Sequence, residues 1–158
     1  MFILRTLLLL ALVVWVGGII FFAFVLAPTV FTVLPTTELA GNVVGRSLTV
    51  LHWMGIVSAV VFLICSLLYN RARFARLKPL ALINVLVLVM LAFTLISQFG
   101  ISARMRTLRA ELHAADHPGV TNTSNREFNR LHQWSTRLEG GVLAMGFLTV
   151  VLTARRWS

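Results

Sequence analysis

The chain has 158 residues, of which 58% are hydrophobic and 12% charged, with a mean hydropathy of +0.89 and a formal net charge of +9. In a soluble domain roughly a quarter of the residues are charged, so this composition excludes an ordinary soluble domain. It indicates an integral membrane protein that is too short for several domains. We expect the lipid bilayer, and no nucleic acid, as its partner, and the single Cys65 excludes an intrachain disulfide.

Charged residues divide the chain into four apolar runs, taken here in chain order. A transmembrane helix needs about 20 apolar residues to cross about 30 Å of hydrocarbon. The runs therefore predict an all-α fold, an integral membrane four-helix bundle with antiparallel up-down topology, as one domain over residues 1–158. The approximate spans are 4–27, 48–69, 79–102 and 136–154, and residues 103–135 form an outer loop with helical extensions.

The first run, from Thr6 to Ala27, exceeds the roughly 7 to 15 apolar residues of a signal peptide. A cleavage site after "VLA" would also be followed by Pro28, so we expect a mature helix here. Pro28 and Pro35 should kink or terminate this helix near its outer end, because proline lacks a backbone donor.

Small residues mark expected helix contacts on the first two runs. The "WVGG" segment allows another backbone to approach closely, and small residues also occupy one face of the second run. The residues assigned to helix packing are Gly17, Gly18, Gly55 and Ala59.

The fourth run is short, because Gly140 to Ala154 covers only about 22 Å at the helical rise. To span the bilayer, this helix must draw part of the preceding "LHQWSTRLE" segment into the interface. Ser124 followed by Glu127 is a capping-box pattern, which predicts that the fourth helix begins there, well before it enters lipid.

Positive charge predicts the orientation. The short connection "NRARFARLK" and the two termini hold seven cations and no acid, whereas the other side holds seven cations and all five acids. Since cytoplasmic connections are enriched in Lys and Arg, both termini should be cytoplasmic, in a bacterial inner membrane.

Polar residues of three helices are expected to meet near the outer mouth of the bundle. The polar side of the fourth helix forms one stripe at 100° per residue, and the second and third runs each have a polar or small-residue face. Such faces point into a bundle, because polar groups facing lipid go unsatisfied. The predicted polar cluster is His52, Gln98, His132, Ser135 and Glu139.

Several roles fit this cluster. It could fix helix register, with no cofactor and no catalysis, or form a path for a proton or small solute. A histidine pair, His52 and His132, could instead ligate haem iron or copper and carry electrons, and copper or zinc could also take Glu139 or Met54 as a further ligand. No nucleophile, base and orienter arrangement is present, so we expect no enzymatic activity. A homo-oligomer and a subunit of a larger membrane complex both remain open.

Three segments together resemble a known family. They are "WVGGIIFFAFVLAPTVF" from Trp15, "AGNVVGRSLTVLHWMG" from Ala40 and "FNRLHQWS" from Phe128. In order and spacing they are similar to the domain-of-unknown-function 4149 family, itself similar to transmembrane protein 205. More distantly, the Trp-x-Gly-Gly helix is similar to bacterial copper-resistance membrane domains.

The resemblance implies a four-helix bundle without established catalytic residues. The family element Phe-x-x-Leu-His-x-x-Ser maps onto Phe128, Leu131, His132 and Ser135. One turn further on the family pattern leads us to expect asparagine, where this chain has Glu139.

Overall fold

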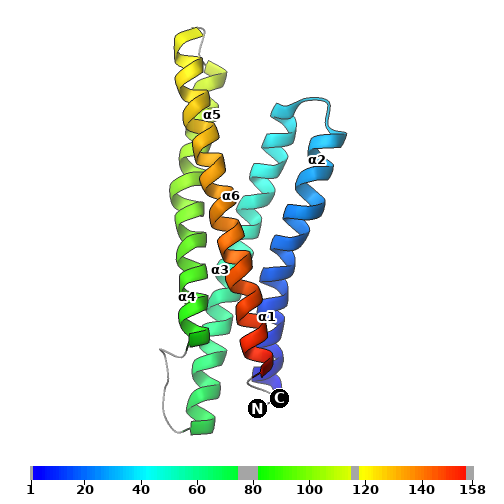
Figure 1. Ribbon diagram of the computed structural model, residues 1–158, viewed down its shortest axis with the longest axis vertical. Helices are drawn as coiled ribbons and strands as arrows, with labels where there is room; N and C mark the ends of the chain where they lie inside the picture. Colours follow the sequence, from blue (N-terminus) through cyan, green and yellow to red (C-terminus); the bar gives the residue numbers. More distant parts are fainter. Residues whose placement is uncertain (1, 75–81, 115–117, 156–158) are drawn as a thin grey trace.

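The computed structural model describes residues 2–74, 82–114 and 118–155, and it is helical throughout these ranges apart from a short turn at residues 34–36 (Figure 1). Two π-helical segments interrupt the α-helices. The elements in chain order are α1 (Phe2–Phe21), η1 (Phe22–Leu26), α2 (Ala27–Val33), α3 (Thr37–Phe74), α4 (Leu82–Leu95), η2 (Ile96–Ile101), α5 (Ser102–Ala114) and α6 (Pro118–Arg155).

Consecutive helical elements join into four continuous stretches, which we name rods, and each rod is long and apolar enough to cross a membrane. This confirms the all-α fold and the expected number of spans. Each begins or ends beyond the apolar run that predicted it, because helix continues into polar sequence on both sides of the hydrocarbon. The rods are Phe2–Val33, Thr37–Arg71, Leu82–Leu108 and Arg126–Arg155. Exposed apolar side chains such as Phe24 and Val57 line their outer faces, as bilayer contact requires.

The two prolines of the first rod behave differently. Pro28 lies in the first turn of α2, directly after the π-helical η1, where the Ala27 N–H donates to the Phe22 carbonyl. A wider turn at this point accommodates a residue that cannot donate and that would crowd the preceding turn, so the rod continues. Before Pro35, Leu34 turns to an extended conformation and the rod ends, as predicted.

The start of the last helix was predicted wrongly. α6 begins at Pro118, before the Ser124 capping-box pattern, and runs without interruption to Arg155. Proline is favoured in the first turn of a helix because its missing donor has no partner there in any case, and this signal was overlooked.

Close packing between α1 and α3 forms the tightest part of the core. Trp15 lies against Gly55, where an added Cβ would come within 2.5 Å of the indole Nε1. Leu51 lies against Gly18, where an added Cβ would come within 2.9 Å of Leu51 Cδ1. Ala59 is completely buried on the same rod. Gly17 was assigned to this contact wrongly, because it is exposed and a Cβ added there would meet no atom of the described residues within 4 Å.

The rods diverge towards one end. The start of α1 and the end of α6 lie together at what we name the proximal end, while the α2–α3 turn lies at the opposite, distal end (Figure 1). There α2 and the first part of α3 lean away from α5 and α6 (Figure 1).

Candidate functional site

A buried histidine joins three rods at the base of the splayed distal end. The His52 side chain on α3 is 1% exposed, and both of its ring nitrogens have partners. Nδ1 lies 2.8 Å from Gln98 Oε1, and Nε2 lies 2.5 Å from Glu139 Oε1. The three residues come from α3, η2 and α6, so the predicted cluster exists in part as a direct contact.

A π-helical turn positions Gln98. In η2 the Ser102 N–H donates to the Ser97 carbonyl, one residue further back than in an α-helix. Ser97 and Gln98 are both buried, although consecutive residues of a regular helix point about 100° apart. The wider turn thus presents two neighbouring polar side chains to the interior, and such local π turns occur often at functional sites.

Glu139 closes the other side of the imidazole. Its side chain is 15% exposed, so it retains some contact with the surroundings while its partner has almost none. With the Gln98 carbonyl oxygen as acceptor, Nδ1 must carry a proton. Nε2 then either donates to a Glu139 carboxylate or accepts from a protonated carboxyl. In both arrangements the pair carries no net charge, which avoids leaving one buried charge uncompensated.

Two predicted members do not join this contact. Ser135 is buried, but its hydroxyl lies 3.4 Å from that of Ser97 and forms a second polar contact between η2 and α6. His132 is exposed. It precedes Glu139 by seven residues, or about 10 Å along the helix.

An apolar layer separates this site from the proximal end. The side chains of this layer are fully or almost fully buried. Each lies on the same rod as a site residue but nearer to the proximal end: Phe62, Val87, Met90 and Val142. Beyond the layer, Ser66 donates to Asn84 Oδ1 at 2.7 Å, and Arg5 donates to the Tyr69 hydroxyl at 2.8 Å. The buried Thr149 hydroxyl also donates to Met90 Sδ at 3.9 Å, so a polar contact occurs within the layer as well.

The residues present do not fit the bis-histidine metal site. Both nitrogens of His52 are engaged, His132 lies about two turns away from Glu139, and Met54 is 41% exposed. Among the residues that the structure describes, no three or more His, Cys, Asp or Glu side chains gather as a metal site would require. His52 and His132 thus have no shared ligand position.

Sequence reasoning missed Ser97. A regular helical wheel places it about 100° from Gln98 and so off the polar face, and only the π turn brings both inward. Gly100, inside the same segment, could have indicated an irregular turn here, because glycine weakens a regular helix.

Residues 10–114 match the model of the family described as Domain of unknown function (DUF4149). Comparisons with curated proteins and with solved structures give no match. The matched residues include His52 and Gln98, while Glu139 lies beyond them. The likeness to transmembrane protein 205 stays a prediction. Because the match covers more than half of the 158 residues, this chain belongs to the DUF4149 family.

Proposed function

We propose that this is a non-enzymatic, multi-pass membrane protein that handles a small solute at its distal end, where the His52–Glu139 pair binds and releases a proton. The proposal includes a bacterial inner membrane, cytoplasmic termini and a distal end that faces outwards. The proposed role requires no cofactor.

One observation carries the proposal: both ring nitrogens of an almost completely buried histidine are held by side chains of two other rods. Imidazole exchanges protons near neutral pH, and ionisable groups inside a membrane bundle commonly mark ion or proton sites. A change in protonation here alters a contact between α3 and α6, so it alters how firmly the splayed rods are joined.

The apolar layer limits what the site does. Phe62, Val87 and Val142 have apolar side chains, and the only polar atom of Met90 is its thioether sulfur, which accepts from Thr149 at 3.9 Å. Such a largely apolar lining favours a site that communicates with one side of the membrane over a pore.

The test is ¹⁵N nuclear magnetic resonance of histidine-labelled protein in micelles, recorded from about pH 5 to pH 8. We expect the His52 ring signals, assigned by their loss in His52→Gln, to change between two protonation states. Glu139→Gln should change that behaviour, because the shared proton has lost its carboxyl partner. His132→Gln serves as the control, since an exposed histidine outside the contact should leave the His52 signals unaltered.

A different outcome would favour the structural alternative. If the His52 signals stay in one state throughout and Glu139→Gln leaves them unchanged, the contact only fixes helix register. The Ser97–Ser135 contact, which also joins η2 to α6 without an ionisable group, is the observation that keeps this alternative in view.

Orientation needs its own test. In a Cys65→Ala background, a cysteine replacing Thr36 at the α2–α3 turn should react with an impermeant thiol reagent in intact cells. A cysteine replacing Phe2, at the other end of the first rod, should be shielded until the membrane is opened. The reverse labelling pattern would contradict the proposed orientation.

A further inference from the structure

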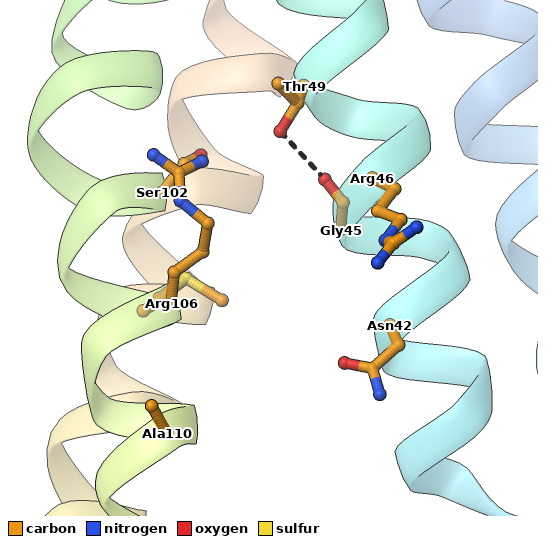
Figure 2. Close-up of a pocket in the computed structure, with 8 residues that line it drawn as sticks. Asn42, Gly45, Arg46, Thr49, Ser102, Arg106 and Ala110 are labelled. Atoms are coloured by element: carbon orange, nitrogen blue, oxygen red, sulfur yellow. Dashed lines mark hydrogen bonds between the residues drawn. The ribbon is translucent and has the colours of Figure 1, made fainter.

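A second feature of the distal end is a cleft of about 370 Å³ between α3 and α5 (Figure 2). Four residues from each helix line it: Asn42, Gly45, Arg46 and Thr49 from α3, and Ser102, Met105, Arg106 and Ala110 from α5. Two of these are cationic, three carry neutral polar side chains, and none is acidic. The lining thus favours an anion that also has apolar parts.

The deep end of the cleft lies close to the buried histidine. Thr49 precedes His52 by three residues and Ser102 follows Gln98 by four, so each wall ends about one helical turn, or about 5 Å, from the His52–Gln98 hydrogen bond. The Thr49 hydroxyl donates to the Gly45 carbonyl at 3.1 Å on the α3 wall (Figure 2). The cleft is therefore the space just distal to the proposed proton site.

The two arginines of the cleft differ from a neighbouring arginine. Arg104 is bound by Glu127 through two hydrogen bonds, at 2.9 and 3.2 Å, on the side of α5 that faces α6. Within residues 2–74, 82–114 and 118–155, neither Arg46 nor Arg106 forms an ion pair, and both are exposed. The charge of Arg104 is compensated, whereas two guanidinium groups on the cleft walls are available to an anion.

Arg106 and Asn42 are directed towards the cleft, whereas the Arg46 guanidinium lies over α3 (Figure 2). Arg106 runs back along α5 towards the level of Ser102, as helical side chains do, which brings its guanidinium group towards the deep end (Figure 2). The Asn42 amide points from α3 into the gap between the helices (Figure 2). Guanidinium binds phosphate through paired hydrogen bonds, and a neutral amide and hydroxyls supply further contacts.

Exposed apolar side chains lie near the deep end of the cleft. Val50 on α3, next to Thr49, is 60% exposed, and Phe99 on η2, three residues before Ser102, is 59% exposed. Both walls belong to rods able to cross a membrane. An amphiphile with acyl chains in the bilayer has access to this site from the side, whereas nothing in the apolar rim favours a free, fully hydrated ion.

We propose that the cleft binds the anionic headgroup of a membrane phospholipid, with Arg46 and Arg106 on opposite walls holding its phosphate. Basic pockets between transmembrane helices are a recurring form of anionic-lipid site. This inference goes beyond the proposed proton site and does not depend on it, since it rests on the cleft and its charges alone.

The test measures lipid binding to the purified full chain by native mass spectrometry in detergent, with phosphatidylglycerol and phosphatidylcholine as probes. We expect selective binding of phosphatidylglycerol. In Arg46→Gln/Arg106→Gln this binding should weaken by about tenfold or more, as the loss of charge-assisted hydrogen bonds implies. Arg46→Lys/Arg106→Lys should weaken it less, because lysine keeps the charge but not the planar fork.

A matched control removes the same charge from another surface. Arg126→Gln/Arg130→Gln changes two exposed arginines of α6 and should leave phosphatidylglycerol binding within about twofold of that of the unaltered chain. Glu139→Gln should also retain binding, so that failure of the proton site and failure of the lipid site are told apart. Circular dichroism confirms that each variant is folded.

Three results would overturn the assignment. Equal binding of the two lipids would exclude headgroup recognition, and equal loss in the Arg126/Arg130 variant would reduce it to nonspecific attraction. Displacement of phosphatidylglycerol by millimolar inorganic phosphate, with the same dependence on Arg46 and Arg106, would replace the lipid by a free anion.

Discussion

The two sides of α3 are held by opposite means. Towards α1, Leu51 and Gly55 meet Gly18 and Trp15 in close apolar packing. One residue along from Leu51, His52 faces Gln98 and Glu139 of the other rods through hydrogen bonds. Adjacent residues of one helix thus serve two interfaces of different chemistry.

The difference shows what each interface tolerates. Lipid is as apolar as a side chain, so rods in a membrane associate through close packing and hydrogen bonds and gain little from the hydrophobic effect. The α1 side should therefore be sensitive to added volume, and the α4 and α6 side to the loss of a polar partner. Substitutions on the two sides of α3 should therefore differ in their effect on the free energy of unfolding.

The largest effect is expected on the polar side. Glu139→Ala leaves His52 buried without its carboxyl partner and should lower the free energy of unfolding by about 3–5 kcal/mol, as for other broken buried pairs. Reversible unfolding in detergent measures this change. His132→Ala is the control on the same helix and should stay within about 0.5 kcal/mol, because that side chain is exposed. A large loss at His132 instead would restore the broader cluster expected from the sequence.

The apolar side should respond less strongly. In Gly55→Ala the new Cβ would lie 2.5 Å from Trp15 Nε1, too close without displacing the indole ring. Overpacking of this kind costs about 1–3 kcal/mol. Gly17→Ala has open space at its Cβ and should gain up to about 1 kcal/mol from helix propensity. Equal effects at the two glycines, measured by the same unfolding experiment, would show that the α1–α3 contact is not the tight interface.

The smallest effect concerns a buried hydroxyl at the proximal end. Thr153 Oγ1 is buried and has no hydrogen-bond partner among the residues that the structure describes, whereas Thr149 Oγ1 donates to the Met145 carbonyl at 2.8 Å. Thr153→Val keeps the shape and should raise the free energy of unfolding by about 1 kcal/mol, because it removes an unsatisfied group. Thr149→Val should lower it by about 1 kcal/mol. A loss at Thr153 would point to a partner that the hydroxyl acquires in the membrane.

Sequence periodicity predicted the rods and part of the site, for an identifiable reason. Distances along a helix are regular, so counting inward from Arg46 and Arg104 placed His52 and Gln98 at one depth. The same regularity put His132 on the face of Glu139, but the His132 side chain is exposed. Which part of a helical face the neighbouring rods cover depends on how the rods diverge, and this was not predictable from one helix at a time (Figure 1).

Local departures from the regular helix account for the other misses. The π turn of η2 turns Ser97 inward, which a period of 3.6 residues does not anticipate. The bond from Arg5 to Tyr69 joins the start of the first rod to the end of the second, so it depends on how far each helix extends past the apolar run. Helix ends are harder to predict from sequence than helix interiors, and the early start of α6 at Pro118 is another error of this kind.

A double-mutant cycle between His52 and Glu139 tests most directly whether the two residues form one coupled site. Unfolding free energies are measured for His52→Gln, Glu139→Gln and the double variant, with the His132→Gln and Glu139→Gln cycle beside it. We predict a coupling of about 1–3 kcal/mol for His52 with Glu139 and additivity within about 0.5 kcal/mol for His132 with Glu139. Additivity in the His52 cycle would contradict the account, because two residues in direct contact through a shared proton cannot contribute independently.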